Sequence, residues 1–184
     1  MKIFYAVDCQ KDFINKDGRL SVPGAMDIKS NIERWCRFSK YSQSPLWASV
    51  DWHDLNDVEF NKFPPHCIKG TKGAELIDEV AKFNPTIIPK LTYDVFAEPF
   101  VGRLLDFHEV DEVVVFGVVT EICVAAAIEG FLQQNIKVSL ATDAIMYLDK
   151  FKADAYIAAW EKKGVKTTIM GEKIYAEYDS LRQY

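Results

Sequence analysis

Short apolar runs recur along the whole chain, separated by polar stretches that carry glycine, proline, aspartate or asparagine. Runs of roughly four to eight apolar residues between turn residues are typical of β-strands. Strands that lack polar alternation are typical of a sheet covered on both faces. The pattern predicts six strands, which span residues 2–7, 46–50, 86–89, 111–117, 137–141 and 165–170.

Segments with a helical period lie between these strands. The clearest is 25–41, in which Ile28, Ile32 and Trp35 recur at helical spacing. Further helices are expected at 74–83, 99–107, 122–135 and 150–163. Gly164 follows the last of them, in the position where glycine commonly ends a helix.

The alternation of strands and helices predicts an α/β fold, with three αβα layers and a central, mostly parallel sheet of about six strands. No repeat, linker or low-complexity segment interrupts the chain, so we expect a single domain over residues 1–184. Open sheets of this kind bind ligands beyond the carboxyl ends of their strands, near the point where the strand order reverses.

Polar residues with chemical potential follow four of the predicted strands. Asp8 follows the first strand, Asp51 and His53 the second, Lys90 the third and Cys123 the fourth. The carboxyl ends of parallel strands share one edge of a sheet, so we expect these side chains to converge. If the first and fourth strands are central neighbours, Asp8 and Cys123 face each other.

Cys123 lies just after the strand that ends at Gly117 and just before a run of small helical residues. The free N–H groups of a helix N-terminus favour negative charge and can lower a thiol pKa well below its free value of about 8.5. Asp8 could take the thiol proton while Lys90 keeps Asp8 ionised, which is the logic of nucleophilic catalysis. Taken singly, each residue also has an ordinary structural interpretation: a buried thiol, a turn cap and a solvated lysine.

Asp51 and His53 are two residues apart at a strand end and therefore point the same way. The stretch 54–73 has no periodicity, and loops of this length are usually functional or disordered. It could return His66 to the same place, and a carboxylate with two imidazoles suits zinc, manganese or iron. Spacing alone leaves another interpretation open, in which the histidines bond the loop backbone. His108 follows a helix and is expected to be exposed.

Composition narrows the class of protein. The chain has 184 residues, 49% of them hydrophobic, enough for a full core. A net charge of −5 without a basic block argues against nucleic acid as a partner. No apolar stretch has the length of a membrane span or signal peptide. The four cysteines lack paired spacing, which indicates reduced thiols and a cytoplasmic location; a homo-oligomer is compatible with the sequence.

Five motifs stand out in chain order: residues 7–13 (VDCQKDF), 51–53 (DWH), 66–76 (HCIKGTKGAEL), Lys90 with Tyr93 and Phe96, and 120–124 (TEICV). Together they resemble the nicotinamidase/pyrazinamidase family, a branch of the isochorismatase-like cysteine hydrolases. The resemblance runs from about residue 2 to residue 170. The metal motifs at 51–53 and 66 separate nicotinamidases from isochorismatases, which lack that site and the nucleophilic cysteine.

The resemblance implies a catalytic triad. Cys123 would be the nucleophile, Asp8 its general base and later proton donor, and Lys90 the third member. It also implies a cis peptide between Val118 and Val119. The backbone N–H groups of Val119 and Cys123 would then form the oxyanion hole.

The resemblance further implies one divalent metal ion, zinc in the first place and manganese or iron otherwise. Its ligands would be Asp51, His53 and His66, and Glu59 matches a glutamate that completes the set in some relatives. Asp54, Asn56 and Asp57 are nearby substitutes for Glu59.

The substrates implied are nicotinamide and pyrazinamide. Phe13 and Phe63 would sandwich the pyridine ring, and Tyr93 would line the same pocket. The activity implied is hydrolysis of a linear carboxamide to an acid and ammonia through a cysteine thioester, a step of NAD salvage.

The chain departs from many relatives at Glu121, where they have aspartate, and at Ala127, where they have threonine. These departures leave the triad intact. Two alternatives stay open: a sibling cysteine amidohydrolase for another small amide or ureido compound, and a non-catalytic protein that keeps only the fold. Phe13, Phe63 and the metal motif argue against the first alternative. The complete triad argues against the second.

Overall fold

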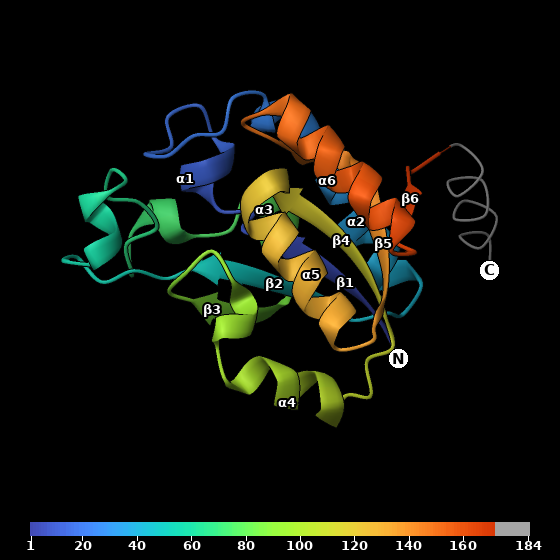
Figure 1. Ribbon diagram of the computed structural model, residues 1–184. Helices are drawn as coiled ribbons and strands as arrows, with labels where there is room; N and C mark the ends of the chain where they lie inside the picture. The colour runs from blue at the N-terminus through green and yellow to red at the C-terminus, as the bar shows by residue number, and fades with distance from the viewer. Residues whose placement is uncertain (172–184) are drawn as a thin grey trace.

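The computed structural model describes residues 1–171; the tail at 172–184, which the sequence does not assign to an element, lies outside them. The centre is a six-stranded sheet in the order β3-β2-β1-β4-β5-β6, and every pairing is parallel (Figure 1). The predicted α/β class and the six strands are confirmed.

The strands are β1 (Lys2–Val7), β2 (Leu46–Asp51), β3 (Thr86–Lys90), β4 (Glu112–Val118), β5 (Lys137–Met146) and β6 (Lys166–Thr168). The α-helices are α1 (Lys11–Ile14), α2 (Lys29–Tyr41), α3 (Asp78–Ala81), α4 (Phe100–Phe107), α5 (Ala125–Gln133) and α6 (Lys150–Lys162).

Two apolar cores, one on each face of the sheet, hold three layers together. Along β1, Phe4 packs into a core that α2 and α3 cover, while Tyr5 packs into a core that α4, α5 and α6 cover. In Figure 1, α5 and α6 lie in front of the sheet and α2 lies behind it. Both faces are covered, which is why β1 and β2 are almost wholly apolar.

The strand order reverses between β1 and β4, which lie side by side in the middle of the sheet. The expected central pairing is therefore confirmed. Gly117 of β4 is opposite Val7 of β1, and a Cβ at Gly117 would collide with the carbonyl oxygen of Val7. Its φ of +121° is one that glycine adopts readily. The glycine thus lets the two strand ends approach closely where a ligand is expected.

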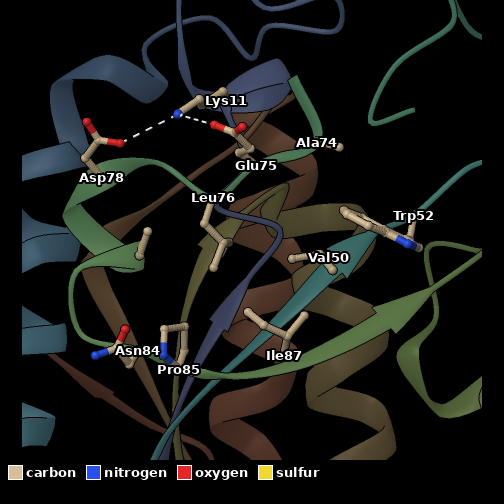
Figure 2. Close-up of a pocket in the computed structure, with 11 residues that line it drawn as sticks. Lys11, Val50, Trp52, Ala74, Glu75, Leu76, Asp78, Asn84, Pro85 and Ile87 are labelled. Carbon is tan, nitrogen blue, oxygen red and sulfur yellow. Dashed lines mark hydrogen bonds and ion pairs between the residues drawn. The ribbon is translucent and has the colours of Figure 1, made fainter. Parts of the chain in front are cut away.

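The helix predicted at 74–83 is wrong in its first half, since only Asp78–Ala81 is helical. Leu76 instead forms an antiparallel bridge with Gln10, and the N–H of Ile77 bonds the carbonyl of Cys9. Figure 2 shows this extended stretch, with Leu76 across a hollow of about 510 Å³ from Val50. Pairing with a distant segment has replaced the local helix.

Other boundaries also differ. β5 runs to Met146, five residues beyond the predicted end, with a register shift against β4. The helix predicted at 122–135 is divided into a π-helical turn, Thr120–Val124, and α5. The helix predicted at 25–41 begins with a 3-10 turn at Ala25–Ile28, and the last strand is limited to Lys166–Thr168.

Within residues 1–171, none of the helices combines the length and apolar character that crossing a membrane would require.

Candidate active site

A small cavity opens at the carboxyl ends of β1, β2 and β4. It measures about 160 Å³, well below the roughly 300–1,000 Å³ of pockets that hold drug-sized ligands. Its lining residues are Phe13, Leu20, Ser21, Val22, Asp51, Glu59, Phe63, His66, Tyr93, Val119, Ile122, Cys123 and Leu148. Such a cavity suits a single small ring better than a long ligand.

Asp8, Lys90 and Cys123 come together beside this cavity. The Lys90 ammonium lies 2.8 Å from Asp8 Oδ2 and 3.9 Å from Cys123 Sγ. The Asp8 carboxylate lies near enough to the Cys123 thiol to raise its pKa. Asp8 and Lys90 are each only 1% exposed. The structure therefore brings the acid, the cation and the thiol together, as the strand-end argument predicts, with Lys90 in contact with both of the others.

Burial governs how these groups ionise. It raises the pKa of the Cys123 thiol well above its usual value, and the nearby Lys90 ammonium opposes this without reversing it. Burial also raises the pKa of the Asp8 carboxyl, again against the effect of Lys90. The expectation that a helix N-terminus lowers the Cys123 pKa is therefore wrong, because desolvation of the thiolate outweighs the favourable charges. The thiol rests protonated and needs a base.

Ser49 is a polar contact of Asp8 that sequence reasoning missed. Its hydroxyl is buried and donates to Asp8 Oδ1 at 2.7 Å, while the Asp8 N–H bonds the carbonyl of Ser49. Asp8 itself has a φ of 49°, a left-handed conformation that aspartate tolerates better than most residues. The only available signal was a serine inside the apolar strand 46–50.

The peptide bond between Val118 and Val119 is cis, as the resemblance implies. Val119 and Cys123 both line the cavity, on either side of the start of the π-helical turn. The assignment of their N–H groups to an oxyanion hole stays a prediction.

Asp51, His53 and His66 form a cluster whose ligand atoms all lie within 4.8 Å of one another. Asp51 Oδ2 is 3.8 Å from the Nε2 atoms of both His53 and His66. All three side chains are buried. One carboxylate and two imidazoles with room for further ligands match the donor set of catalytic zinc sites.

The far nitrogen of each imidazole is held in place. His53 Nδ1 donates to Asp57 at 3.0 Å, and His66 Nδ1 donates to the carbonyl of Pro64 at 2.8 Å. Both Nε2 atoms are thereby directed toward Asp51. His53 Nε2 is buried without a hydrogen-bond partner among the described residues, a costly arrangement that a metal ion would relieve. These residues fit a metal ion.

Charge around the cluster favours a cation. Burial alone would lower the pKa of His53, but Asp51 and Asp57 raise it to about 9. Burial alone would raise the pKa of Asp51, but Lys90 and the two imidazoles hold it well below its usual range. A metal ion that binds here must displace a proton from His53, so affinity should fall as the pH falls.

Glu59 lies close to the cluster, with Oε2 3.9 Å from His53 Nε2. It sits on a 3-10 turn, Val58–Asn61, that begins with Asp57 as its cap. The substitute ligand Asp57 is instead turned to His53 Nδ1, where it orients the ring. The geometry thus keeps Glu59 as the candidate fourth ligand.

Three aromatic residues that the sequence nominates line the cavity. Phe13 is buried, with its ring centroid 5.5 Å from that of His66. Phe63 and Tyr93 are both exposed, and the ring of Phe63 lies 6.4 Å from that of His66. Phe13 therefore belongs to the cavity wall and the other two to its rim. His108 lies away from the cavity and is exposed, as expected.

Sequence reasoning missed the apolar residues that complete the cavity: Leu20, Val22, Ile122 and Leu148. Ile122 stands inside the motif at 120–124 and could have been nominated from it. Leu148 has no such signal. Its position depends on a contact distant in sequence: Glu121 accepts hydrogen bonds from the N–H groups of Leu148 and Asp149.

The sequence pattern of the isochorismatase domain matches residues 3–170. The chain is 25% identical over 205 residues to a nicotinamidase from Escherichia coli, covering 89% of this chain and 91% of that protein. The chain therefore belongs to the isochorismatase family.

Solved structures agree. A pyrazinamidase from Pyrococcus horikoshii in complex with zinc superposes with a TM-score of 0.85 at 26% identity, covering 92% of this chain and 99% of that one. An N-carbamoylsarcosine amidase from Thermoplasma acidophilum superposes with a TM-score of 0.79 at 25% identity, covering 91% and 95%. The fold is thus shared by hydrolases with different substrates.

We predict that the protein purified without chelators holds one equivalent of a divalent metal ion. His53→Ala and His66→Ala should each leave the protein well below stoichiometric metal, because each removes one of three buried donors. His108→Ala, at an exposed histidine, is the matched control and should keep the full equivalent. Elemental analysis measures all three.

Full metal content in both ligand variants would reject the site. Normal content in Glu59→Ala would reject only Glu59 as a ligand.

Proposed function

We propose that this member of the isochorismatase family is a nicotinamidase, which hydrolyses nicotinamide to nicotinate and ammonia through a thioester on Cys123. The observation that carries the proposal is the contact of Lys90 with both the Cys123 thiol and Asp8, beside a small cavity that Asp51 and His66 also line. A nucleophile and a cation-binding cluster thereby share one ring-sized space.

The first half-reaction forms the thioester. Asp8 takes the proton of the Cys123 thiol, and the sulfur attacks the carboxamide carbon. The oxygen of the tetrahedral intermediate would accept bonds from the N–H groups of Val119 and Cys123, worth about 3 kcal/mol per donor in other acyl-transfer enzymes. The C–N bond then breaks, and Asp8 returns its proton to the departing ammonia.

The second half-reaction releases the acid. Asp8, ionised again, takes a proton from a water molecule, whose oxygen attacks the thioester carbon. The carbon–sulfur bond breaks, nicotinate leaves, and the thiolate recovers the proton from Asp8. Lys90 holds Asp8 in place through both halves, at 2.8 Å from Oδ2.

Asp51, His53 and His66, with Glu59 as fourth ligand, would hold the metal ion; zinc is the ion we propose. When bound, the ion supplies a Lewis acid for the ring nitrogen of the substrate. Phe13 and Phe63 would enclose the ring from either side and exclude water. These contacts orient the carboxamide toward Cys123.

A second candidate is a sibling amidase for a small ureido compound, in keeping with the likeness to N-carbamoylsarcosine amidase. The same thiol, acid and lysine would serve that reaction. The aromatic wall of Phe13 beside His66 favours the flat nitrogen ring of nicotinamide over a flexible ureido acid.

The decisive assay is release of ammonia with appearance of nicotinate in equal amount. We expect turnover of nicotinamide and pyrazinamide, a strong rise in KM or loss of activity in chelator, and recovery when zinc is added. N-carbamoylsarcosine should be hydrolysed far more slowly. Turnover of the ureido compound without turnover of nicotinamide would reject the proposal in favour of the sibling amidase.

Cys123→Ala should fold and bind nicotinamide but lose turnover by about 10⁴-fold or more, the scale seen when a catalytic nucleophile is removed. Cys36→Ala, at a buried thiol remote from the cavity, should keep turnover. Steady-state kinetics with a binding measurement checks both variants. Near-wild-type turnover in Cys123→Ala, or a nicotinoyl adduct on Cys9 or Cys67, would contradict the thioester mechanism.

Lys90→Met should weaken both stability and catalysis. Removing the buried cation leaves Asp8 and Asp51 uncompensated, at a cost of about 3–5 kcal/mol in the free energy of unfolding. It should also raise the pKa of Asp8 further. Asp8 must be ionised to act as base, and with a higher pKa it protonates sooner as the pH falls. The acid limb of the pH–rate profile should therefore move to higher pH.

Lys150→Met removes an exposed lysine paired with Asp154 and is the control. It should leave both the free energy of unfolding and the pH profile close to those of the wild type, because an exposed ion pair contributes little. A Lys90→Met profile that superposes on the wild type would place Lys90 outside the reaction.

A further inference from the structure

Gln10, between β1 and α1, is wholly buried, and its side chain makes three hydrogen bonds. Its Nε2 donates to the carbonyl oxygen of Asp51 at 2.8 Å and to that of Ala74 at 2.9 Å. Its Oε1 accepts the N–H of Asp51 at 2.7 Å. Two of the bonds thus grip the backbone of Asp51 on both sides of its Cα, which fixes the direction of its side chain.

Asp12, on the first turn of α1, bonds the backbone next to His66, another ligand of the cluster. Its Oδ2 accepts the N–H of Cys67 at 2.7 Å, and its Oδ1 accepts the N–H of Arg19 at 3.0 Å. Cys67 directly follows His66, and its carbonyl bonds the N–H of His53. The carboxylate therefore sets the backbone from which His66 projects.

The loop that follows His66 passes directly beside the Asp12 side chain. A Cβ at Gly73 would lie only 2.2 Å from Asp12 Oδ2, so a larger residue would clash with the carboxylate in its present position. The next residue, Ala74, is the one whose carbonyl Gln10 binds. Residues 66–74 are thus tied at both ends to the short segment that follows β1.

Neither Gln10 nor Asp12 lines the cavity, so neither is placed to touch a substrate. Both are buried polar side chains that hydrogen-bond to backbone: Gln10 to Asp51 and Ala74, and Asp12 to Cys67 and Arg19. Chemistry at the reacting atoms does not account for them. The stretch 66–74 has little regular structure, only a bridge between Ile68 and His53 and a single 3-10 turn.

We propose that Gln10 and Asp12 are positioning residues for the metal site. Gln10 fixes the orientation of the ligand Asp51, and Asp12 fixes the orientation of the ligand His66. The inference rests on the metal site of the proposed function. Partners of this kind, one step removed from the ion, typically contribute about 10–100-fold to metal affinity. The two residues act before any substrate arrives, so their effect is measurable without turnover.

Two near-isosteric changes separate this role from a loss of packing. Gln10→Glu keeps the shape but replaces the donating amide by a carboxylate oxygen that faces two carbonyl oxygens. Asp12→Asn keeps the shape but removes the charge and can accept through only one oxygen.

Asp143→Asn is the matched control. The Asp143 carboxylate also accepts two hydrogen bonds, from Trp35 Nε1 at 2.8 Å and from the N–H of Met170 at 2.9 Å. It belongs to β5 and does not line the cavity. Asp143→Asn should lower stability by weakening the same kind of hydrogen bond, without affecting the orientation of the metal ligands.

The test is titration of metal-free protein with Zn²⁺ against a chromophoric chelator. Gln10→Glu and Asp12→Asn should raise the Kd for Zn²⁺ by about 10–100-fold, while Asp143→Asn leaves it at the wild-type value. The melting temperature without metal reports the structural cost of each change. The rate at which iodoacetamide alkylates Cys123, followed on its peptide, should be equal in all four proteins.

Wild-type Zn²⁺ affinity in either folded variant overturns the role of that residue. Weakening by Asp143→Asn to the same degree overturns the inference as well, because the effect is then one of stability. A wild-type protein that binds no Zn²⁺ overturns the metal site itself and, with it, the proposed function's ligand set. Should Gln10→Glu fail to fold, Asp12→Asn still tests whether a buried residue behind the cluster positions a metal ligand, in this case His66.

Discussion

The site depends on one buried cation. Lys90 is only 1% exposed, and a lysine taken out of water alone would lose its charge. Burial on its own lowers the pKa of Lys90, but Asp8 and Asp51 raise it well above its usual value. Its ammonium also donates to the carbonyl of Thr92 at 3.0 Å. Lys90 therefore stays charged, and its charge is divided between two carboxylates.

Those carboxylates belong to different tasks. Asp8 directly follows β1 and lies beside the thiol, whereas Asp51 ends β2 and faces the two imidazoles. Asp51 is paired in register with Lys90 across β2 and β3, so the sheet itself brings the cation to both. Buried ion pairs are weak evidence for stability, since apolar substitutes often serve as well. The retention of three buried charges is better explained by the joint placement of the thiol and the metal ligands.

Sequence reasoning reached the parts of the site that strands position. A residue that ends a parallel strand has a predictable edge and direction, which is why Asp8, Asp51, Lys90 and Cys123 could be brought together in advance. Ser49 escaped notice because its role depends on pairing with a neighbouring strand. The segment 74–77 was misassigned for the same reason: its partners, Cys9 to Lys11, are more than 60 residues away.

The ionisation of Cys123 shows a different limit. A helix start is visible in a sequence, but the density of atoms around a thiol is not, and here that density determines the sign of the pKa change. The loop 54–73 has no period, so only the fold reveals that Glu59 lies near His53 and that Phe63 is exposed. The resemblance to the family identifies Glu59 and Phe63 as candidates, and the structure shows where their side chains lie.

The long connection between β2 and β3, which projects at the left of Figure 1, has a consequence for the lifetime of the protein. His53 stands at its start and His66 further along it, so an ion bound by both would close the loop between them as a covalent crosslink would. Ligands that bind only the folded form stabilise it by about 2.7 kcal/mol when their free concentration is roughly a hundred times Kd. Proteases cleave segments that unfold locally, and a bound ion would make local unfolding of this loop rarer. The supply of metal would therefore determine how long the chain survives as well as how fast it works.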